Sequence, residues 1–556
     1  MAQPSMTPWQ RLIGLIELEK KDILQIFYYA IFAGIVALTL PLGIQAIINL
    51  IQGAQISTSW IVLVILVTAG VTLSGILQLM QLRIIETIQQ RIFLRSSFEL
   101  AYRFPKIKMS ELRNYYPPEL ANRFFDTLTI QKGLSKILID VPSAILQILF
   151  SLVLLSFYHP FFIIFGIILL ALIIVVFMFT AKKGLETSLK ESKNKYRVVH
   201  WIQEIARTLI SFKLSGKTSL ALTKNDSLVD DYLKARENHF TILVTQFIQM
   251  ITFKVIITAG LLLIGGALVL NQEMNIGQFV AAEIIILLII ASVEKLILGL
   301  ESFYDVLTSI EKLGQIIDKD LEDQEGKKPM FKDQLNIELD DVYYKVPNFK
   351  ESILKSITLK IAPSSRILIL GESGAGKSTL LRLISGVVEP TSGNIYVNNL
   401  SLSSINLNHY RAQLGLSLTE ETPFEGTIRT NLTFGNLEIT EEEIFETLEN
   451  IGLLEYIKKQ PKGLETYLYP DGKQMSHTVS KKLILARAIL KKPKLLILED
   501  ALDRFNPLET NSIINYLTHP DRPWILIVVS GSDSWKPKCT QTIELDRGKI
   551  KKITYA

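Results

Sequence analysis

Six long apolar segments within the first 301 residues constrain the fold of this chain more than any other feature. A helix that crosses a bilayer needs about 20 apolar residues. Segments of this kind lie at residues 24–51, 57–82, 142–158, 161–180, 241–270 and 276–300. Only His159 and Pro160 separate the short third segment from the fourth, so one re-entrant pair is the alternative to two crossings. Six crossings explain the charge pattern better, and an even number places both termini on one side.

The loops between these segments indicate their orientation. The loops after the first, third and fifth segments are short and contain no Lys or Arg, whereas those after the second and fourth are long and strongly basic. Because basic loops remain in the cytoplasm, both termini are expected there, in a multi-pass protein of a bacterial-type inner membrane. The same placement explains the net charge of +5 without a nucleic-acid partner.

The long basic loops carry apolar residues at helical spacing, for example from Ile202 to Leu209, and contain few helix breakers. This pattern predicts that membrane helices extend into the cytoplasm within a transmembrane domain of residues 24–317. Two solvated loops are the alternative. Residues 1–23 are expected to form an amphipathic elbow helix at the inner interface, with Trp9, Leu12, Ile13 and Ile16 apolar. A signal peptide is not expected, because no short apolar core with a cleavage site comes first.

Ionisable residues inside the apolar segments are energetically costly and therefore informative. At 1.5 Å per residue, Lys254 and Glu294 lie about 24 and 27 Å from the outer ends of their segments, so a pair between them is expected. Glu283 lies about 10 Å deep, with no partner at that depth in this chain. We interpret Glu283 as a candidate for lining a substrate path, and a structural hydrogen bond between helices is the alternative.

The second half of the chain has a different character. A charged linker at residues 318–334 is followed from Leu335 by short apolar runs separated by turns. These runs predict a strand-rich α/β domain over residues 335–556. Cys539 is the only cysteine, so no intrachain disulfide can form, and nothing in the sequence suggests a metal cluster.

A glycine-rich loop follows the strand expected at residues 366–370 and precedes an apolar helix. It matches the phosphate-binding pattern G-x-x-x-x-G-K-[ST] in the strand, loop and helix context that the pattern requires. The loop consists of Gly371, Glu372, Ser373, Gly374, Ala375, Gly376, Lys377, Ser378 and Thr379. Its backbone N–H groups are expected to wrap the phosphates of a nucleotide, Lys377 to neutralise them and Ser378 to ligate Mg²⁺. A chance glycine-rich turn is the alternative.

A second strand ends in two carboxylates. Residues 494–498 read as a buried parallel strand, and Glu499 and Asp500 follow. We expect this strand end to supply the metal and water chemistry beside the phosphate-binding loop.

Together these features resemble a half-transporter of the ABC exporter family, over nearly the whole chain. Further segments that carry the resemblance are residues 390–395, 424–432 and 486–490, and residues 118–124 in the first cytoplasmic loop. The resemblance implies an all-α six-helix transmembrane domain with long cytoplasmic extensions, followed by an α/β P-loop NTPase domain of the ABC type. It also implies ATP and Mg²⁺ as cofactors.

The resemblance further implies partners. A second half-transporter subunit, identical or different, is expected, with Glu119 and Arg123 in the loop that docks on the nucleotide domain. Segments three and four resemble the branch of the family that exports proteins and peptides with a periplasmic adaptor, which makes an adaptor a candidate partner.

The catalytic pattern of the family is altered in several places. The resemblance puts Glu499 at the Mg²⁺ aspartate and Asp500 at the catalytic glutamate, so the acidic pair is inverted. An aspartate is about 1 Å shorter, and such a displacement can cost on the order of 100-fold in rate. Ser530 replaces the switch histidine and Thr419 the glutamine that contacts the metal.

The family signature LSGGQ becomes Met-Ser-His-Thr-Val at residues 475–479 and keeps only Ser476. Ser476 is expected to cap the following helix and so aim its N-terminus at a γ-phosphate held by the partner subunit.

Three functions follow, in decreasing order of support. The first is an exporter subunit that couples ATP binding and slow hydrolysis to alternating access. The second is a pseudo-transporter, a membrane scaffold or regulator that binds ATP without turning it over. The third, a nucleotide-gated channel, lacks a supporting pattern of pore-lining charge. A mainly apolar cavity suits lipids, peptides and drugs alike, so the sequence does not identify the substrate.

Overall fold

The computed structural model describes residues 6–53, 58–113, 115–331, 335–347 and 349–555, without the side chains of residues 172, 173 and 175–181. The chain divides into two compact units. The first comprises Met1–Ile107 and Glu111–Asp320, and the second comprises Lys108–Ser110 and Leu321–Ala556. The division after Asp320 falls inside the linker expected at residues 318–334, of which residues 332–334 lie outside the described part.

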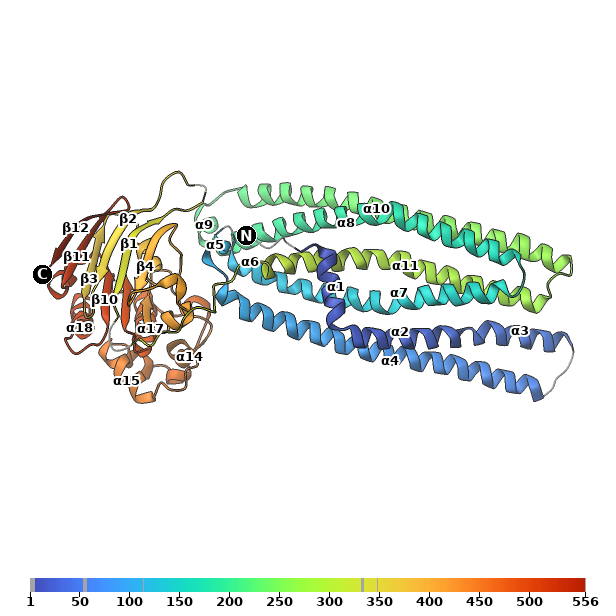
Figure 1. Cartoon of the computed structure of the whole chain (residues 1–556), viewed down its shortest axis with the longest axis horizontal. Helices are drawn as coiled ribbons and strands as arrows, with labels where there is room; N and C mark the ends of the chain where they lie inside the picture. The colour runs from blue at the N-terminus through green and yellow to red at the C-terminus, as the bar shows by residue number, and fades with distance from the viewer. Residues whose placement is uncertain (1–5, 54–57, 114, 332–334, 348, 556) are drawn as a thin grey trace. The chain divides into compact units, whose positions relative to one another are not determined.

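The first unit is helical (Figure 1). Its main helices are α1 (Pro8–Leu18), α2 (Lys20–Ala37), α3 (Thr39–Gln52), α4 (Thr58–Arg103), α6 (Pro117–Asn122), α7 (Asp126–Ser156), α8 (Phe161–Arg207), α9 (Leu209–Leu214), α10 (Leu220–Leu270) and α11 (Ile276–Ile317). Helices α4, α8 and α10 have 46, 47 and 51 residues. At 1.5 Å per residue each is about 70 Å long, more than twice the thickness of a bilayer core. The predicted extensions of the membrane helices beyond the bilayer are therefore present, and their cytoplasmic placement stays a prediction.

The expected crossings coincide with these helices. Among the described residues, five helical stretches are long and apolar enough to cross a membrane, and Phe161–Ala171 is a shorter apolar one at the start of α8. Helix α7 has 31 residues, enough for a full crossing, so the re-entrant alternative is not needed. The first crossing is interrupted at Leu38, between α2 and α3. Pro41 explains this break, because proline has no N–H to donate to the preceding turn.

Packing within the first unit pairs α11 with α7, α10 with α8, and α2 with α4 (Figure 1). Buried side chains from α7, α8, α10 and α11 form one apolar core, including Ile148, Phe165, Phe253 and Ile285. The predicted ion pair is confirmed, since Lys254 Nζ lies 2.5 Å from Glu294 Oε2.

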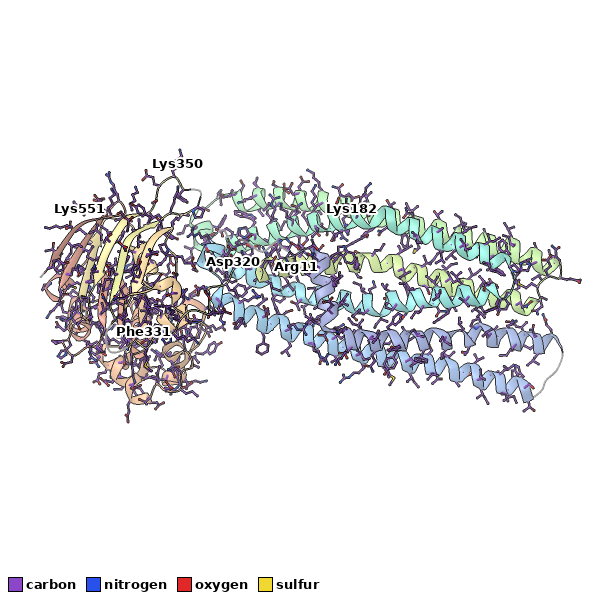
Figure 2. The ribbon with its side chains drawn as sticks, viewed as in Figure 1. Arg11, Lys182, Asp320, Phe331, Lys350 and Lys551 are labelled. Carbon is purple, nitrogen blue, oxygen red and sulfur yellow. The ribbon has the colours of Figure 1, made fainter. Side chains whose placement is uncertain are left out.

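The N-terminal helix α1 is anchored at its start and along one face. Thr7 and Gln10 form a reciprocal capping box. Leu12 is buried, and Arg11 donates a hydrogen bond of 3.0 Å to Asp318 at the end of α11 (Figure 2). Trp9 is exposed, and the placement of α1 at a membrane interface stays a prediction.

The second unit contains a four-stranded antiparallel sheet and a six-stranded, mostly parallel one (Figure 1). The first has the order β2-β1-β4-β5, with β1 (Ile337–Tyr344), β2 (Leu354–Ile361), β4 (Ser392–Val397) and β5 (Leu400–Ser401). The second has the order β12-β11-β3-β10-β9-β6, with β3 (Arg366–Gly371), β6 (Leu414–Ser417), β9 (Leu495–Glu499), β10 (Ile525–Val529), β11 (Gln541–Asp546) and β12 (Lys549–Tyr555). Strands β7 (Gly426–Thr427) and β8 (Tyr467–Leu468) form a separate pair.

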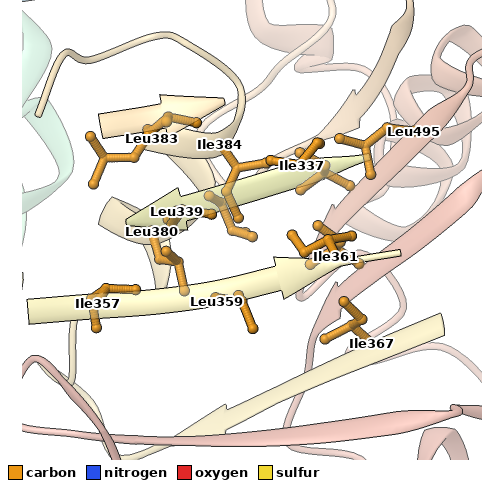
Figure 3. Packing of buried hydrophobic residues seen from close by; sticks show 14 of the residues in the cluster. Ile337, Leu339, Ile357, Leu359, Ile361, Ile367, Leu380, Leu383, Ile384 and Leu495 are labelled. Carbon is orange, nitrogen blue, oxygen red and sulfur yellow. The ribbon is translucent and has the colours of Figure 1, made fainter. Parts of the chain in front are cut away.

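Helices cover the six-stranded sheet on both faces. They are α12 (Lys377–Ile384), α13 (Leu407–Arg411), α14 (Ile428–Thr433), α15 (Glu441–Asn450), α16 (Leu454–Lys458), α17 (His477–Leu490) and α18 (Pro507–Leu517). Side chains alternate along β3, so Ile367 and Ile369 join one core and Leu368 joins the other. In Figure 3, Ile367 lies near Ile361 of β2, and Leu380 of α12 lies near Leu339 of β1. These two cores fix the strand ends that carry the candidate site.

Candidate functional site

The phosphate-binding loop joins β3 to α12, and its lysine folds back over it. Lys377 Nζ donates hydrogen bonds to the carbonyl oxygens of Gly371 at 2.7 Å and Glu372 at 2.9 Å. The ammonium group therefore lies inside the curve of the loop, where a polyphosphate would meet both its charge and the backbone N–H groups.

Two glycines determine the path of this loop. Gly374 and Gly376 have φ angles of 84° and 97°, in the left-handed region. A Cβ atom on Gly376 would lie 2.7 Å from Cδ2 of Leu354, so a larger residue there would also collide with β2. The predicted loop residues Ser373, Gly374 and Ser378 are exposed, and the Ser378 hydroxyl is therefore accessible in the first turn of α12.

The acidic strand end lies at the same sheet edge as this loop. Ile369 of β3 and Glu499 of β9 both pair with Val529 of β10, which runs parallel to them. Two strand spacings, about 10 Å, separate the two positions. The topology thus brings the Glu499–Asp500 pair to the phosphate-binding loop, although more than 120 residues separate them in the chain.

Glu499 is held by the segment that follows β6. Its side chain is buried, and its Oε2 atom accepts a hydrogen bond of 3.3 Å from the backbone N–H of Thr419. The Thr419 hydroxyl in turn lies 3.5 Å from the carbonyl oxygen of Glu499. The backbone at Thr419 therefore orients this carboxylate at the strand end.

Asp500 is part of a carboxyl pair that the sequence analysis missed. Its φ angle is 46°, and its N–H donates to the Val529 carbonyl at 2.9 Å. Burial, then the neighbouring Asp503 carboxylate, then Glu499 raise the pKa of Asp500, while Lys377 lowers it. The carboxyl groups of Asp500 and Asp503 are therefore electrostatic neighbours. The only signal in the sequence was a second aspartate three positions after the first.

Ser530, which follows β10, completes this group. Its hydroxyl donates to Oδ1 of Asp503 at 3.1 Å and accepts the N–H of Ser532 at 3.1 Å. In this arrangement the Ser530 hydroxyl is engaged with a carboxylate.

Helix α17 begins at His477 and is capped as its sequence predicts. The Ser476 hydroxyl accepts the N–H of Val479 at 3.3 Å. Both Ser476 and His477 are exposed. The N-terminus of a 14-residue helix, with its partial positive charge, is therefore open to solvent within this unit.

Lys481, on the same helix, is a second group that sequence reasoning missed. Its side chain is buried and donates to the carbonyl oxygens of Leu418 at 3.0 Å and Thr419 at 2.9 Å. Burial lowers the pKa of Lys481, against the carboxylates of Glu421, Glu499 and Asp500. Through this lysine α17 is tied to the backbone segment that orients Glu499.

The remaining predicted residues lie in the first unit. Glu119 lies 3.2 Å from a ring nitrogen of His200, and the buried Arg123 donates to Gln315 at 2.6 Å. Their docking on the nucleotide domain stays a prediction. Glu283 is half-buried in α11, and its part in a substrate path also stays a prediction.

The site offers a donor set that suits Mg²⁺ bound together with a nucleotide. Among the described residues, no group of three or more His, Cys, Asp or Glu side chains could hold a metal ion. Mg²⁺ is commonly held by one or two protein oxygens together with phosphate oxygens and water. The exposed Ser378 hydroxyl and the Glu499 carboxylate are ligands of that kind.

Comparison with known families matches both halves of the chain. Residues 23–293 match the family model described as the ABC transporter transmembrane region, and residues 354–503 match the one described as ABC transporter. A bacterial Atm1-family ABC exporter with ATP bound has the same fold, with a TM-score of 0.84, 16% sequence identity and coverage of 97% of this chain and 96% of that one.

Two curated relatives show the extent of the similarity in sequence. The alpha-hemolysin translocation ATP-binding protein HlyB of Escherichia coli O157:H7 is 27% identical over 305 residues, which are 55% of this chain and 43% of the relative. An ATP-dependent lipid A-core flippase of Burkholderia orbicola (strain AU 1054) is 27% identical over 306 residues, 55% of this chain and 51% of the relative. The chain thus spans about half the length of these relatives.

Proposed function

The chain belongs to the ABC transporter family, with the transmembrane and ATP-binding domains of an exporter, and we propose that it is one subunit of a dimeric exporter with slow ATP turnover. Closure of two nucleotide domains on Mg·ATP would drive the change between inward-facing and outward-facing membrane helices. The partner, identical or different, supplies the second nucleotide domain. A bacterial inner membrane and a periplasmic adaptor remain expectations.

The observation that carries this proposal is the geometry at the carboxyl ends of β3 and β9. The loop backbone and Lys377 would bind the phosphates, while Ser378 and Glu499 would hold Mg²⁺, which supplies charge stabilisation when bound. Asp500 stands beside this site as the candidate base that accepts a proton from the attacking water.

The neighbours of Asp500 supply the reason for slow turnover. A general base works in its ionised form, and burial together with the neighbouring Asp503 carboxylate favours the protonated form of Asp500. Ser530 interacts with Asp503 and so is directed away from the role of orienting water or phosphate. The shorter Asp500 side chain adds a distance penalty.

Steady-state Mg·ATP hydrolysis by the full chain in lipid tests this proposal. Asp500→Asn should reduce turnover to background, because it removes the base. Asp500→Glu should raise turnover by about tenfold or more, because the longer side chain recovers part of the distance penalty. ATP binding, measured in parallel, should stay within about threefold in both variants. A slow exporter is contradicted if Asp500→Asn turns over ATP at the wild-type rate.

The pH dependence of turnover tests the role of Asp503 separately. Because Asp503 raises the pKa of Asp500, the acidic limb of the pH–rate profile should lie above the ordinary range of an aspartate. Asp503→Asn removes the neighbouring charge, so the acidic limb should move to lower pH. At pH values on the wild-type acidic limb, the variant should therefore turn over ATP faster than the wild type. An unshifted limb in Asp503→Asn would show that the Asp503 carboxylate does not raise the pKa of Asp500.

The scaffold alternative is favoured by the side chains at the start of α17, where His477 and Thr478 occupy positions that glycines hold in the family signature. ATP binding without turnover in both the wild type and Asp500→Glu would support that alternative. Turnover that rises with a transported substrate would exclude it.

A further inference from the structure

Three membrane helices of the first unit direct polar residues into one groove. On α4, Ser74, Gln78 and Gln81 recur at intervals of four and three residues, which places them on one helix face. Ser143 and Gln147 do the same on α7, and Ser292 and Lys295 on α11. Small residues of α2 close the remaining wall, at Ala30, Ala33, Gly34 and Ala37.

The groove has a volume of about 230 Å³. A water molecule occupies about 30 Å³ in the liquid, so the groove holds the equivalent of roughly eight waters. This is room for one charged head group with some water, and too little for a whole lipid or a folded peptide. Next to the groove-lining Gln78, the apolar side chain of Leu79 is 66% exposed. Leu79 does not line the groove, so the apolar tails of an amphiphile whose head entered it would lie outside, on the apolar surface of α4.

Several polar groups of the groove have open donors. Gln81 donates to the Ile26 carbonyl at 3.1 Å, and Gln147 donates to Ser151 at 3.2 Å. Within the described part of the chain, neither Lys295 nor Gln78 has a hydrogen-bond or ion-pair partner. A lysine ammonium has three N–H donors and an amide has two, so this pair is equipped to bind an oxyanion.

The charge of the groove is positive. No carboxylate is among its lining residues. The adjacent Glu294 is already paired with Lys254 at 2.5 Å, so it does not neutralise Lys295. Lys295 is exposed, so its ammonium group is accessible to an anion that enters the groove.

The depth of Lys295 indicates where such an anion comes from. Lys295 lies 19 residues after the start of α11, or about 28 Å along the helix from its outer end. With a hydrocarbon core about 30 Å thick, this is the level of the inner-leaflet head groups. A lysine that merely extends to the interface is the plain alternative. That alternative explains why a lysine is tolerated at this position. It does not explain why polar residues of α4 and α7 face the same groove.

We propose that this groove binds the anionic head group, a phosphate or carboxylate, of an inner-leaflet amphiphile that the protein exports. This inference rests on the proposed export function and names its substrate class. Lys295 supplies the charge and Gln78 a neutral donor, while the apolar part of the amphiphile stays against exposed apolar side chains such as Leu79.

Binding to the purified full chain in neutral detergent, without nucleotide, tests the groove directly. The probes for native mass spectrometry are dioleoyl phosphatidate, oleate, dioleoylglycerol and inorganic phosphate. The wild type should bind phosphatidate or oleate more tightly than dioleoylglycerol. Lys295→Gln should weaken binding of the anionic lipid by about tenfold or more, the usual size of a charge-assisted hydrogen bond. Gln78→Leu should weaken it by less.

Two further variants separate the groove from general attraction to positive charge. Lys295→Arg keeps the charge and should bind within a few-fold of the wild type. Lys182 is exposed on α8 and lies 21 residues, or about 32 Å, from the outer start of that helix (Figure 2). Lys182→Gln therefore removes an exposed charge at nearly the same depth as Lys295. It should leave binding unchanged. The proposal is overturned if Lys295→Gln binds the anionic lipid as tightly as the wild type, or if Lys182→Gln loses as much lipid affinity as Lys295→Gln. Binding of inorganic phosphate in the absence of lipid would also overturn it.

A second measurement links the groove to export. Phosphatidate or oleate should raise ATP turnover of the wild type and leave that of Lys295→Gln unchanged. Lipid binding that depends on Lys295 without any turnover would retain the groove and reject the export function. Turnover that the lipid raises equally in both proteins would retain the ATPase and reject the groove as the substrate site.

Discussion

Lys377→Ala is expected to abolish ATP binding at micromolar nucleotide while leaving the fold intact. The ammonium group lies inside the phosphate-binding loop, 2.7 Å from the Gly371 carbonyl oxygen and 2.9 Å from that of Glu372. Removing one partner of a desolvated charge pair costs about 2–5 kcal/mol, which is roughly 30-fold to several thousand-fold in affinity. Titration of the full chain with ATP, in the presence of Mg²⁺, measures the dissociation constant.

The matched control for this substitution is Lys551→Ala. Lys551 is exposed on β12 of the same unit, far along the sheet order from β9, and its loss should leave ATP affinity unchanged (Figure 2). ATP binding by Lys377→Ala within threefold of the wild type would show that the loop does not hold phosphate as inferred here.

Arg411→Ala is expected to destabilise the second unit by about 3 kcal/mol. Two hydrogen bonds of 2.6 and 2.8 Å join the Arg411 guanidinium to Glu322, whose side chain is buried. Deleting one partner of a buried pair leaves an uncompensated charge, and the usual loss is 3–5 kcal/mol. The lower value applies because the Arg411 side chain is 21% exposed. The midpoint of thermal unfolding should fall by about 6–12 °C.

The reactivity of Cys539 measures this loss of thermal stability. Cys539 is the only cysteine, it lies in the second unit, and it is buried. Its rate of reaction with a thiol reagent during heating therefore reports the opening of this unit alone. Arg429→Ala is the control, because Arg429 pairs with the exposed Glu441 and Glu465, and such pairs contribute less than about 1 kcal/mol. Equal shifts in the two variants would contradict the assignment of a buried pair.

The local parts of the molecule could be predicted from the sequence. The phosphate-binding loop follows from the spacing of Gly371, Gly376 and Lys377 between a strand and a helix, which are all neighbours in the chain. The pair of Lys254 and Glu294 could be predicted as well, since a fixed rise per residue converts position into depth. The break at Leu38 was missed, although Pro41 was visible as its cause.

Contacts between distant segments could not be predicted in this way. Three such contacts depend on how strands and helices are ordered around the sheets. They are the hydrogen bond from Ser530 to Asp503, the one from Lys481 to the Thr419 carbonyl, and the pair of Arg411 with Glu322. Short-range patterns do not specify that order. The expected linker likewise proved to be in part a packed segment, because Glu322 is anchored to α13.

The sequence by itself predicted the long apolar helices of the first unit, the nucleotide domain and its glycine-rich loop, because each depends on local hydropathy or spacing. The tertiary structure alone decided which polar residues of α4, α7 and α11 meet around Lys295. It also decided which carboxylate stands beside Asp500. The physical reason is the same in both cases, since the energy of a polar or charged group depends on its neighbours in space, and packing sets those neighbours.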